Sequence, residues 1–201
     1  MRLLAKAISL LLHPLLLPTY AFILTIYSNP FLFSSYENAK WIFVLRVFIN
    51  TFIFPAISIL LLWRLGFVKH LEMPEKEDRI VPFIVVGTLY IWSFMTFRKS
   101  DEPQILNIIL LGSCFTLFAS FFTNIFSKVS IHAAGMACFT AVSLILTMQS
   151  YFDLRFMFMI TLLLAGITGT ARLYLKAHTL REIWNGYFIG FASQMLAMQF
   201  A

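Results

Sequence analysis

Three residues near the end of the chain have the types and spacing that nucleophilic or acid–base chemistry requires. Arg172, His178 and Glu182 lie in a polar stretch between two apolar ones. His178 and Glu182 are four residues apart, so they share one face of a helix. A carboxylate that accepts a hydrogen bond from one ring nitrogen leaves the other nitrogen free as a nucleophile or base. The planar cation of Arg172 suits a phosphate, although a basic stretch that anchors lipid headgroups has the same composition.

A second candidate group lies earlier in the chain, at the start of the apolar stretch 131–149. It consists of Lys128, Ser130 and His132. A helix N-terminus that carries a hydroxyl, a cation and an imidazole can bind an anion. The simpler alternatives are an N-cap role for Ser130 and an interfacial position for His132.

The composition indicates that these groups lie in a membrane protein. Of the 201 residues, 60% are hydrophobic and 12% are charged, against about 25% charged in ordinary soluble domains. A soluble fold of this size has too little interior for so many apolar side chains, whereas a helix in lipid is free to be apolar on every side. The net charge of +6 requires no nucleic-acid partner, because basic residues near anionic headgroups or around a phosphate explain it.

Seven stretches approach the length of about 20 apolar residues that one membrane crossing needs. The first begins near the N-terminus without a cleavage site, so we expect a retained span, kinked at Pro14 and Pro18. We predict one integral membrane domain, residues 1–201, built as an all-α polytopic transmembrane bundle of six to seven spans, since the third stretch is short. The stretches are 3–27, 41–63, 81–97, 104–126, 131–149, 156–175 and 183–200.

Seven crossings would bring three polar loops to the side of the N-terminus. These are the loops after the second, fourth and sixth stretches, and they contain residues 69–79, 127–132 and 172–182. The polar clusters would thus converge on one membrane face, as an active site requires. The positive-inside rule leaves the orientation open, because half of the basic residues on this side are themselves candidates for holding an anion.

The three clusters resemble the motifs of the type 2 phosphatidic acid phosphatase superfamily, which includes the vanadium haloperoxidases. Its signature is Lys-x6-Arg-Pro, then Pro-Ser-Gly-His, then Ser-Arg-x5-His-x3-Asp. Arg172, His178 and Glu182 keep the spacing of the third motif, and Ser130 and His132 keep the Ser-x-His of the second.

The first motif is the poorest match. Lys76, Arg79 and Pro82 have the right residue types in compressed spacing. The resemblance covers about residues 69–190, and only the third motif is specific.

The resemblance implies a role for each residue. His178 would attack phosphorus to form a phosphohistidine, Glu182 would orient it, and His132 would be the general acid. No metal or other cofactor is implied. The oxygens of the transferred group, where charge develops, would be held by Arg172, Arg79, Ser130 and either Lys76 or Lys128.

The chain also departs from the family pattern. Glu182 replaces an Asp and is one methylene longer, Ile131 replaces a Gly, and Ala171 replaces a Ser. These changes mark either a divergent active branch or a site that has lost activity.

We therefore expect a phosphatase in a bacterial inner (cytoplasmic) membrane, with a membrane lipid phosphomonoester or pyrophosphate as substrate. The alternative is a catalytically inactive relative that binds lipid phosphate or serves as a scaffold or transporter. Haloperoxidase-like chemistry is a weaker third possibility, since it needs bound vanadate. His13 and His70 are interpreted as interfacial. The sequence specifies neither the lipid nor the oligomeric state.

Overall fold

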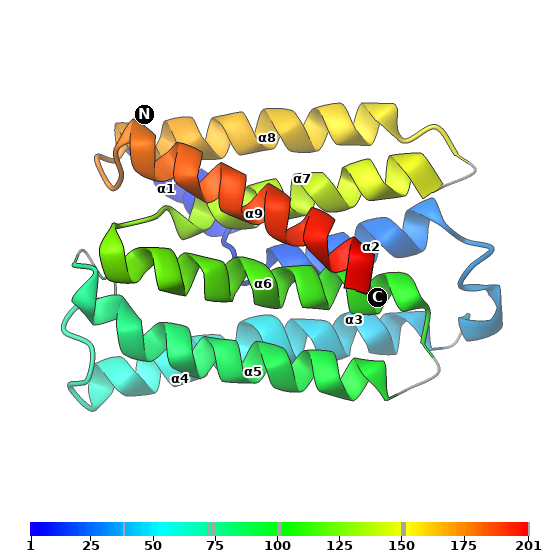
Figure 1. The fold of residues 1–201 in the computed structure, drawn as a ribbon, viewed down its shortest axis with the longest axis horizontal. Helices are drawn as coiled ribbons and strands as arrows, with labels where there is room; N and C mark the ends of the chain where they lie inside the picture. The colour runs from blue at the N-terminus through cyan, green and yellow to red at the C-terminus, as the bar shows by residue number, and fades with distance from the viewer. Residues whose placement is uncertain (38, 72, 74, 100–101, 150–151, 201) are drawn as a thin grey trace.

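The computed structural model describes residues 1–37, 39–71, 73, 75–99, 102–149 and 152–200. Within these ranges the protein is helical and contains no strand, so the all-α prediction is confirmed. Most of the helices lie side by side along the long axis of an elongated bundle (Figure 1). In chain order they are α1 (Arg2–Leu11), α2 (Leu17–Ser28), α3 (Lys40–Phe48), α4 (Phe54–Arg64), α5 (Ile80–Arg98), α6 (Gln104–Phe126), α7 (Ile131–Gln149), α8 (Arg155–Tyr174) and α9 (Leu180–Phe200).

Five helical segments of the described chain are long and apolar enough to cross a membrane. The predicted count of six to seven is not reached, for two reasons. The first apolar run is divided between α1 and α2, and α9 has sufficient length but is less apolar because it contains Asn185 and Gln194. The five segments are Lys40–Arg64, Glu77–Arg98, Gln104–Phe126, Ile131–Gln149 and Arg155–Tyr174.

The outside of the bundle is covered by large apolar side chains. Leu61, Phe156 and Phe188, on three different helices, are all exposed. Contiguous apolar surface of this kind is rare on soluble monomers, and it fits a hydrocarbon surrounding.

Helix α7 lies at the centre of the bundle and packs against α2, α6, α8 and α9. Its contact with α9 is especially close, because a Cβ atom on Gly190 would overlap the carbonyl oxygen of Ala134. A Cβ atom on Gly186 would lie 2.5 Å from the carbonyl oxygen of Ser130. Small residues let two helix backbones approach in this way, so the start of α9 is fixed relative to the start of α7.

The first apolar run is broken rather than merely kinked. Pro14 and Pro18 each lack an N–H for the helical ladder and crowd the preceding turn, and residues 12–16 are not helical. One carbonyl oxygen in this break, that of Leu15, accepts a hydrogen bond from a distant side chain, because Thr51 Oγ1 lies 3.3 Å from it. Irregular backbone at membrane depth is tolerated where it is buried in protein or lines a cavity.

The loops that carry the three candidate clusters meet at one end of the bundle. The α4–α5, α6–α7 and α8–α9 connections lie at the end where the N-terminus also lies (Figure 1). The α3, α6 and α8 helices begin at the opposite end. The helical connectivity therefore positions the candidate site.

Candidate active site

Four of the predicted site residues line a single cavity. Arg79 comes from the start of the α5 segment, His132 from α7, Arg172 from the end of α8 and His178 from the loop before α9. The cavity has a volume of about 260 Å³. Residues that are far apart in the sequence are therefore brought together at one end of the bundle.

His178 and Glu182 form a hydrogen-bonded pair at the entrance to α9. The Nδ1 atom of His178 lies 2.7 Å from Glu182 Oε2. Because a carboxylate only accepts, Nδ1 carries the proton and Nε2 has the lone pair. His178 is 8% exposed, so a buried ring is held in one tautomer with its second nitrogen available as a nucleophile.

The surroundings of His178 favour the neutral imidazole. Burial lowers the pKa of His178 to about 4, and the positive charges of Arg79 and Arg172 act in the same direction. The hydrogen bond to Glu182 opposes this shift of the pKa but does not reverse it. The ring is therefore uncharged at neutral pH, which is the state that can attack phosphorus.

Arg79 is a buried cation held by backbone carbonyl groups. Its Nε atom donates to the Met73 carbonyl oxygen at 3.0 Å, and its Nη1 atom donates to the Val129 carbonyl oxygen at 3.2 Å. Carbonyl dipoles orient a guanidinium without neutralising it, so Arg79 presents its charge to an anion in the cavity. Arg172 adds a second cation, and its Nη1 atom lies 3.5 Å from Ser9 Oγ.

The ring of His132 is attached to the N-terminal helix. Its Nε2 atom lies 3.1 Å from the carbonyl oxygen of Ser9 in α1. A contribution of α1 to the site was not predicted, because the stretches that carry the motif resemblance all lie downstream of it.

Three of the predicted phosphate-binding residues do not line the cavity. The Ser130 hydroxyl accepts from the Ala133 N–H at 3.4 Å, and the Ser130 N–H donates to the Glu182 carbonyl oxygen at 3.2 Å. Ser130 thus caps α7 and ties it to α9, the simpler of its two expected roles. Lys128 lies outside the lining, and Lys76 Nζ is 3.1 Å from the Ile125 carbonyl oxygen.

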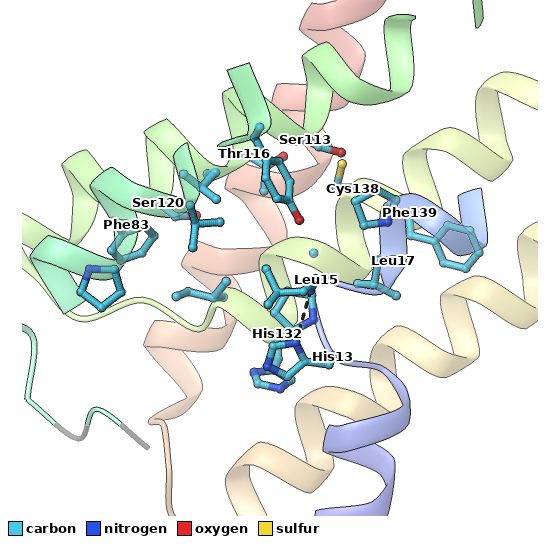
Figure 2. A pocket seen from close by; sticks show the side chains of 18 of the residues that line it. His13, Leu15, Leu17, Phe83, Ser113, Thr116, Ser120, His132, Cys138 and Phe139 are labelled. Atoms are coloured by element: carbon cyan, nitrogen blue, oxygen red, sulfur yellow. Dashed lines mark hydrogen bonds between the residues drawn. The ribbon is translucent and has the colours of Figure 1, made fainter. Parts of the chain in front are cut away.

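His13 lines the cavity, although the sequence suggested an interfacial position. It lies in the break between α1 and α2, next to Pro14. Its ring packs edge-on against that of His132, with 5.3 Å between the ring centroids (Figure 2). The one sequence signal was a His-Pro pair within an apolar run, where an ionisable residue indicates a functional position.

The cavity continues away from the charged residues along an apolar path. Leu17, Phe83 and Phe139 line this part (Figure 2), together with Val86 and Val142. It also carries a row of α6 hydroxyl groups, from Ser113, Thr116 and Ser120. A cavity that is lined by both cationic and apolar side chains fits an amphipathic ligand with an anionic head and a hydrocarbon tail.

Among the described residues, no three His, Cys, Asp or Glu side chains lie close enough together to hold a metal ion. No family model, no curated protein and no solved structure matches this chain. Any assignment of function therefore depends on the geometry of the cavity and on the motif resemblance.

Proposed function

We propose that this chain is an integral membrane phosphatase that hydrolyses a lipid phosphomonoester or pyrophosphate through a phosphohistidine. One observation carries the proposal. A buried, neutral His178 with a fixed tautomer lines a cavity together with two arginines and many apolar side chains. The arginines suit the phosphoryl oxygens, and the apolar part suits a lipid tail.

In the first step, His178 Nε2 forms a bond to phosphorus as the bond to the leaving oxygen breaks. Arg79 and Arg172 stabilise the charge on the phosphoryl oxygens. The leaving oxygen takes one of the two ring protons of a His132 imidazolium, which becomes neutral, and departs as the lipid alcohol, or as the lipid monophosphate when the substrate is a pyrophosphate. Glu182 stabilises the positive charge that forms on His178.

In the second step, water attacks the phosphohistidine. It gives a proton to His132 as the nitrogen–phosphorus bond breaks, which releases inorganic phosphate and restores both histidines. Every proton is carried by a side chain of the protein, so no metal or other cofactor is part of the scheme.

The proposal includes a topology. The α1–α2 pair and α9 complete six or seven crossings of the membrane, which is taken to be a bacterial inner membrane, and the site lies at the headgroup level.

The second candidate is an inactive relative that binds lipid phosphate without hydrolysing it. The engagement of Ser130 in capping α7 favours this alternative, because a hydroxyl expected on the phosphate is used elsewhere.

A substrate panel separates the two candidates. Purified protein in lipid nanodiscs is incubated with a diacylglycerol phosphate, a polyisoprenyl diphosphate and a water-soluble phosphomonoester, each with and without EDTA, and inorganic phosphate is measured. We expect release from a lipid substrate, undiminished by EDTA and absent in His178→Ala. Saturable binding without release would support the inactive relative. Loss of release with EDTA, restored by a divalent metal, would contradict the proposed mechanism.

A further inference from the structure

Two histidines from different elements meet in the cavity and have opposite hydrogen-bonding arrangements. His13 comes from the α1–α2 break and His132 from the first turn of α7, and their rings are in edge-to-face contact (Figure 2). In each ring one nitrogen is hydrogen-bonded to a backbone group. That group is a carbonyl oxygen for His132 and an N–H for His13. This difference determines which ring is able to carry a transferable proton.

His132 is bonded to a group that can only accept. Its Nε2 atom donates to the carbonyl oxygen of Ser9 at 3.1 Å, so Nε2 carries a proton and Nδ1 has the lone pair. A second proton can be added at Nδ1 without loss of the bond to Ser9. His132 is therefore able to alternate between imidazole and imidazolium in place, as a general acid must.

His13 is bonded to a group that can only donate. The backbone N–H of Leu15 donates to His13 Nδ1 at 3.3 Å, so Nδ1 has the lone pair and Nε2 carries the proton. Protonation of Nδ1 would break this bond and leave the Leu15 N–H unpaired in a non-helical, apolar segment, which is costly. His13 is thereby held as a neutral imidazole with a fixed Nε2–H donor.

The groups that share the cavity with His13 reinforce this state. They are His132 from α7, Arg172 from α8, Arg79 from the start of the α5 segment, and His178 from the loop before α9. These four are cations or imidazoles; Tyr90 and Cys138 also line the cavity, and the Glu182 carboxylate bonds His178 from outside the lining. A second proton on either ring would be placed among positive charges, but at His132 the Ser9 carbonyl oxygen stabilises the protonated ring, whereas at His13 the added proton would break the bond from the Leu15 N–H.

We propose that His13 is a further catalytic residue, a fixed neutral donor whose Nε2–H binds a substrate oxygen on the lipid side of the phosphoryl group. His13 lies beside His132, and the same cavity continues from there along the hydrophobic side chains of Leu15 and Leu17. In the leaving step, His132 gives up its Nδ1 proton to the departing oxygen, whereas His13 keeps its proton throughout. Neutral imidazoles act as donors of this kind in other enzymes. The inference rests on the proposed phosphatase function.

The test compares variants that separate hydrogen bonding from proton transfer. His13→Gln keeps a neutral N–H donor, and His13→Phe keeps a flat ring beside His132 but has no donor. His132→Gln removes the transferable proton, and His70→Phe alters an exposed histidine as a control. Each is assayed for kcat/KM from pH 5 to pH 9 on two lipid-tailed phosphates, one with an alkyl and one with a nitrophenyl leaving group.

We expect His13→Phe to lose about tenfold to hundredfold on both substrates, since it loses one hydrogen bond to a charged group. His13→Gln should stay within about threefold of the wild type, with an unchanged pH profile. His132→Gln should lose much more on the alkyl than on the nitrophenyl substrate, because only the alkoxide needs a proton to leave. His70→Phe should match the wild type.

Three results would overturn the inference. They are wild-type activity in His13→Phe, the loss of one limb of the pH profile in His13→Gln, and a His13→Phe defect confined to the alkyl substrate. If His13→Phe does not fold, His13→Leu takes its place. If the wild type releases no phosphate, the proposed function fails, and affinity for an alkyl phosphonate then decides the donor role of His13. A drop of about tenfold in His13→Phe, relative to His70→Phe, supports that role, and an unchanged affinity overturns it.

Discussion

The two ends of the bundle differ in the groups that bond their basic side chains. At the end opposite the cavity, three basic side chains are paired with carboxylates. Arg46 bonds Glu102, Arg155 Nη2 lies 2.6 Å from Asp153 Oδ2, and Lys40 Nζ lies 2.5 Å from Glu37 Oε1. At the cavity end, Arg79 is more deeply buried than any of these cations and bonds backbone carbonyl groups.

This difference separates structural from functional cations. A cation paired with a carboxylate is neutralised locally and exerts little attraction on a further anion. A buried guanidinium held by carbonyl dipoles keeps its charge, at a cost in stability that a bound anion offsets. The cavity end is thus prepared for a phosphate, whereas these three cations of the opposite end are already neutralised by carboxylates.

The largest expected effect is at the nucleophile. His178→Ala should reduce phosphate release by at least about 10⁴-fold, because the described cavity offers no second imidazole with an orienting carboxylate. Arg155→Ala, at the opposite end and exposed, is the matched control and should retain wild-type activity. Comparable activity in the two variants, at equal thermal stability, would remove the functional distinction between the ends.

The second prediction exchanges an arginine at each end for methionine. Arg79→Met should reduce kcat/KM by about 10²–10³-fold, the usual effect of removing one transition-state charge stabiliser, with little loss of stability. Arg46→Met should leave activity unchanged but lower the unfolding free energy by about 1–3 kcal/mol, because the Glu102 side chain, 4% exposed, loses its partner. Enzyme kinetics and urea unfolding measure the two effects. The reverse pattern would contradict the comparison.

The orienting carboxylate should have a smaller effect. Glu182→Gln should reduce activity by about 10²-fold or less, since an amide oxygen still accepts from Nδ1 but does not balance the charge formed on His178. The corresponding group in serine proteases contributes about 10⁴-fold, so a loss of that size would indicate a stricter tautomer requirement. Glu182→Asp measures whether the start of α9 tolerates the shorter side chain found in the motif that this stretch resembles.

The smallest effect concerns pH. The pKa of His178 is lowered from 6.5 to about 4 by burial, so between these values the unfolded chain binds more protons than the folded one. Stability should therefore fall as pH drops from 6.5 towards 4, while the nucleophile itself stays neutral. Unfolding followed from pH 4 to pH 7 should show a shallower decline in His178→Leu than in the wild type. If stability declined equally steeply in the two proteins, His178 would not be the cause of the decline.

The sequence predicted most helices of this fold because apolar runs bounded by polar loops are local signals. It also predicted the pairing of His178 with Glu182, but not its setting: His178 lies in the loop before α9, so the contact spans the start of the helix and does not follow one helical face. The contact of His13 with His132 was not predicted, because it is tertiary and no motif spacing relates the two residues. Ser130 was predicted to bind the phosphate. Because it directly precedes the first turn of α7, its hydroxyl instead accepts a hydrogen bond from the backbone N–H of Ala133.

The most direct test of the central claim is to trap the phosphorylated enzyme. A lipid phosphate carrying a radioactive phosphoryl group is mixed with the protein, the reaction is stopped in alkali within one turnover, and the labelled peptide is sequenced. The account predicts an alkali-stable, acid-labile label on His178 that disappears in His178→Ala. Turnover with no labelled enzyme, or a label on another residue, would contradict the assignment of this cavity as a phosphohistidine site.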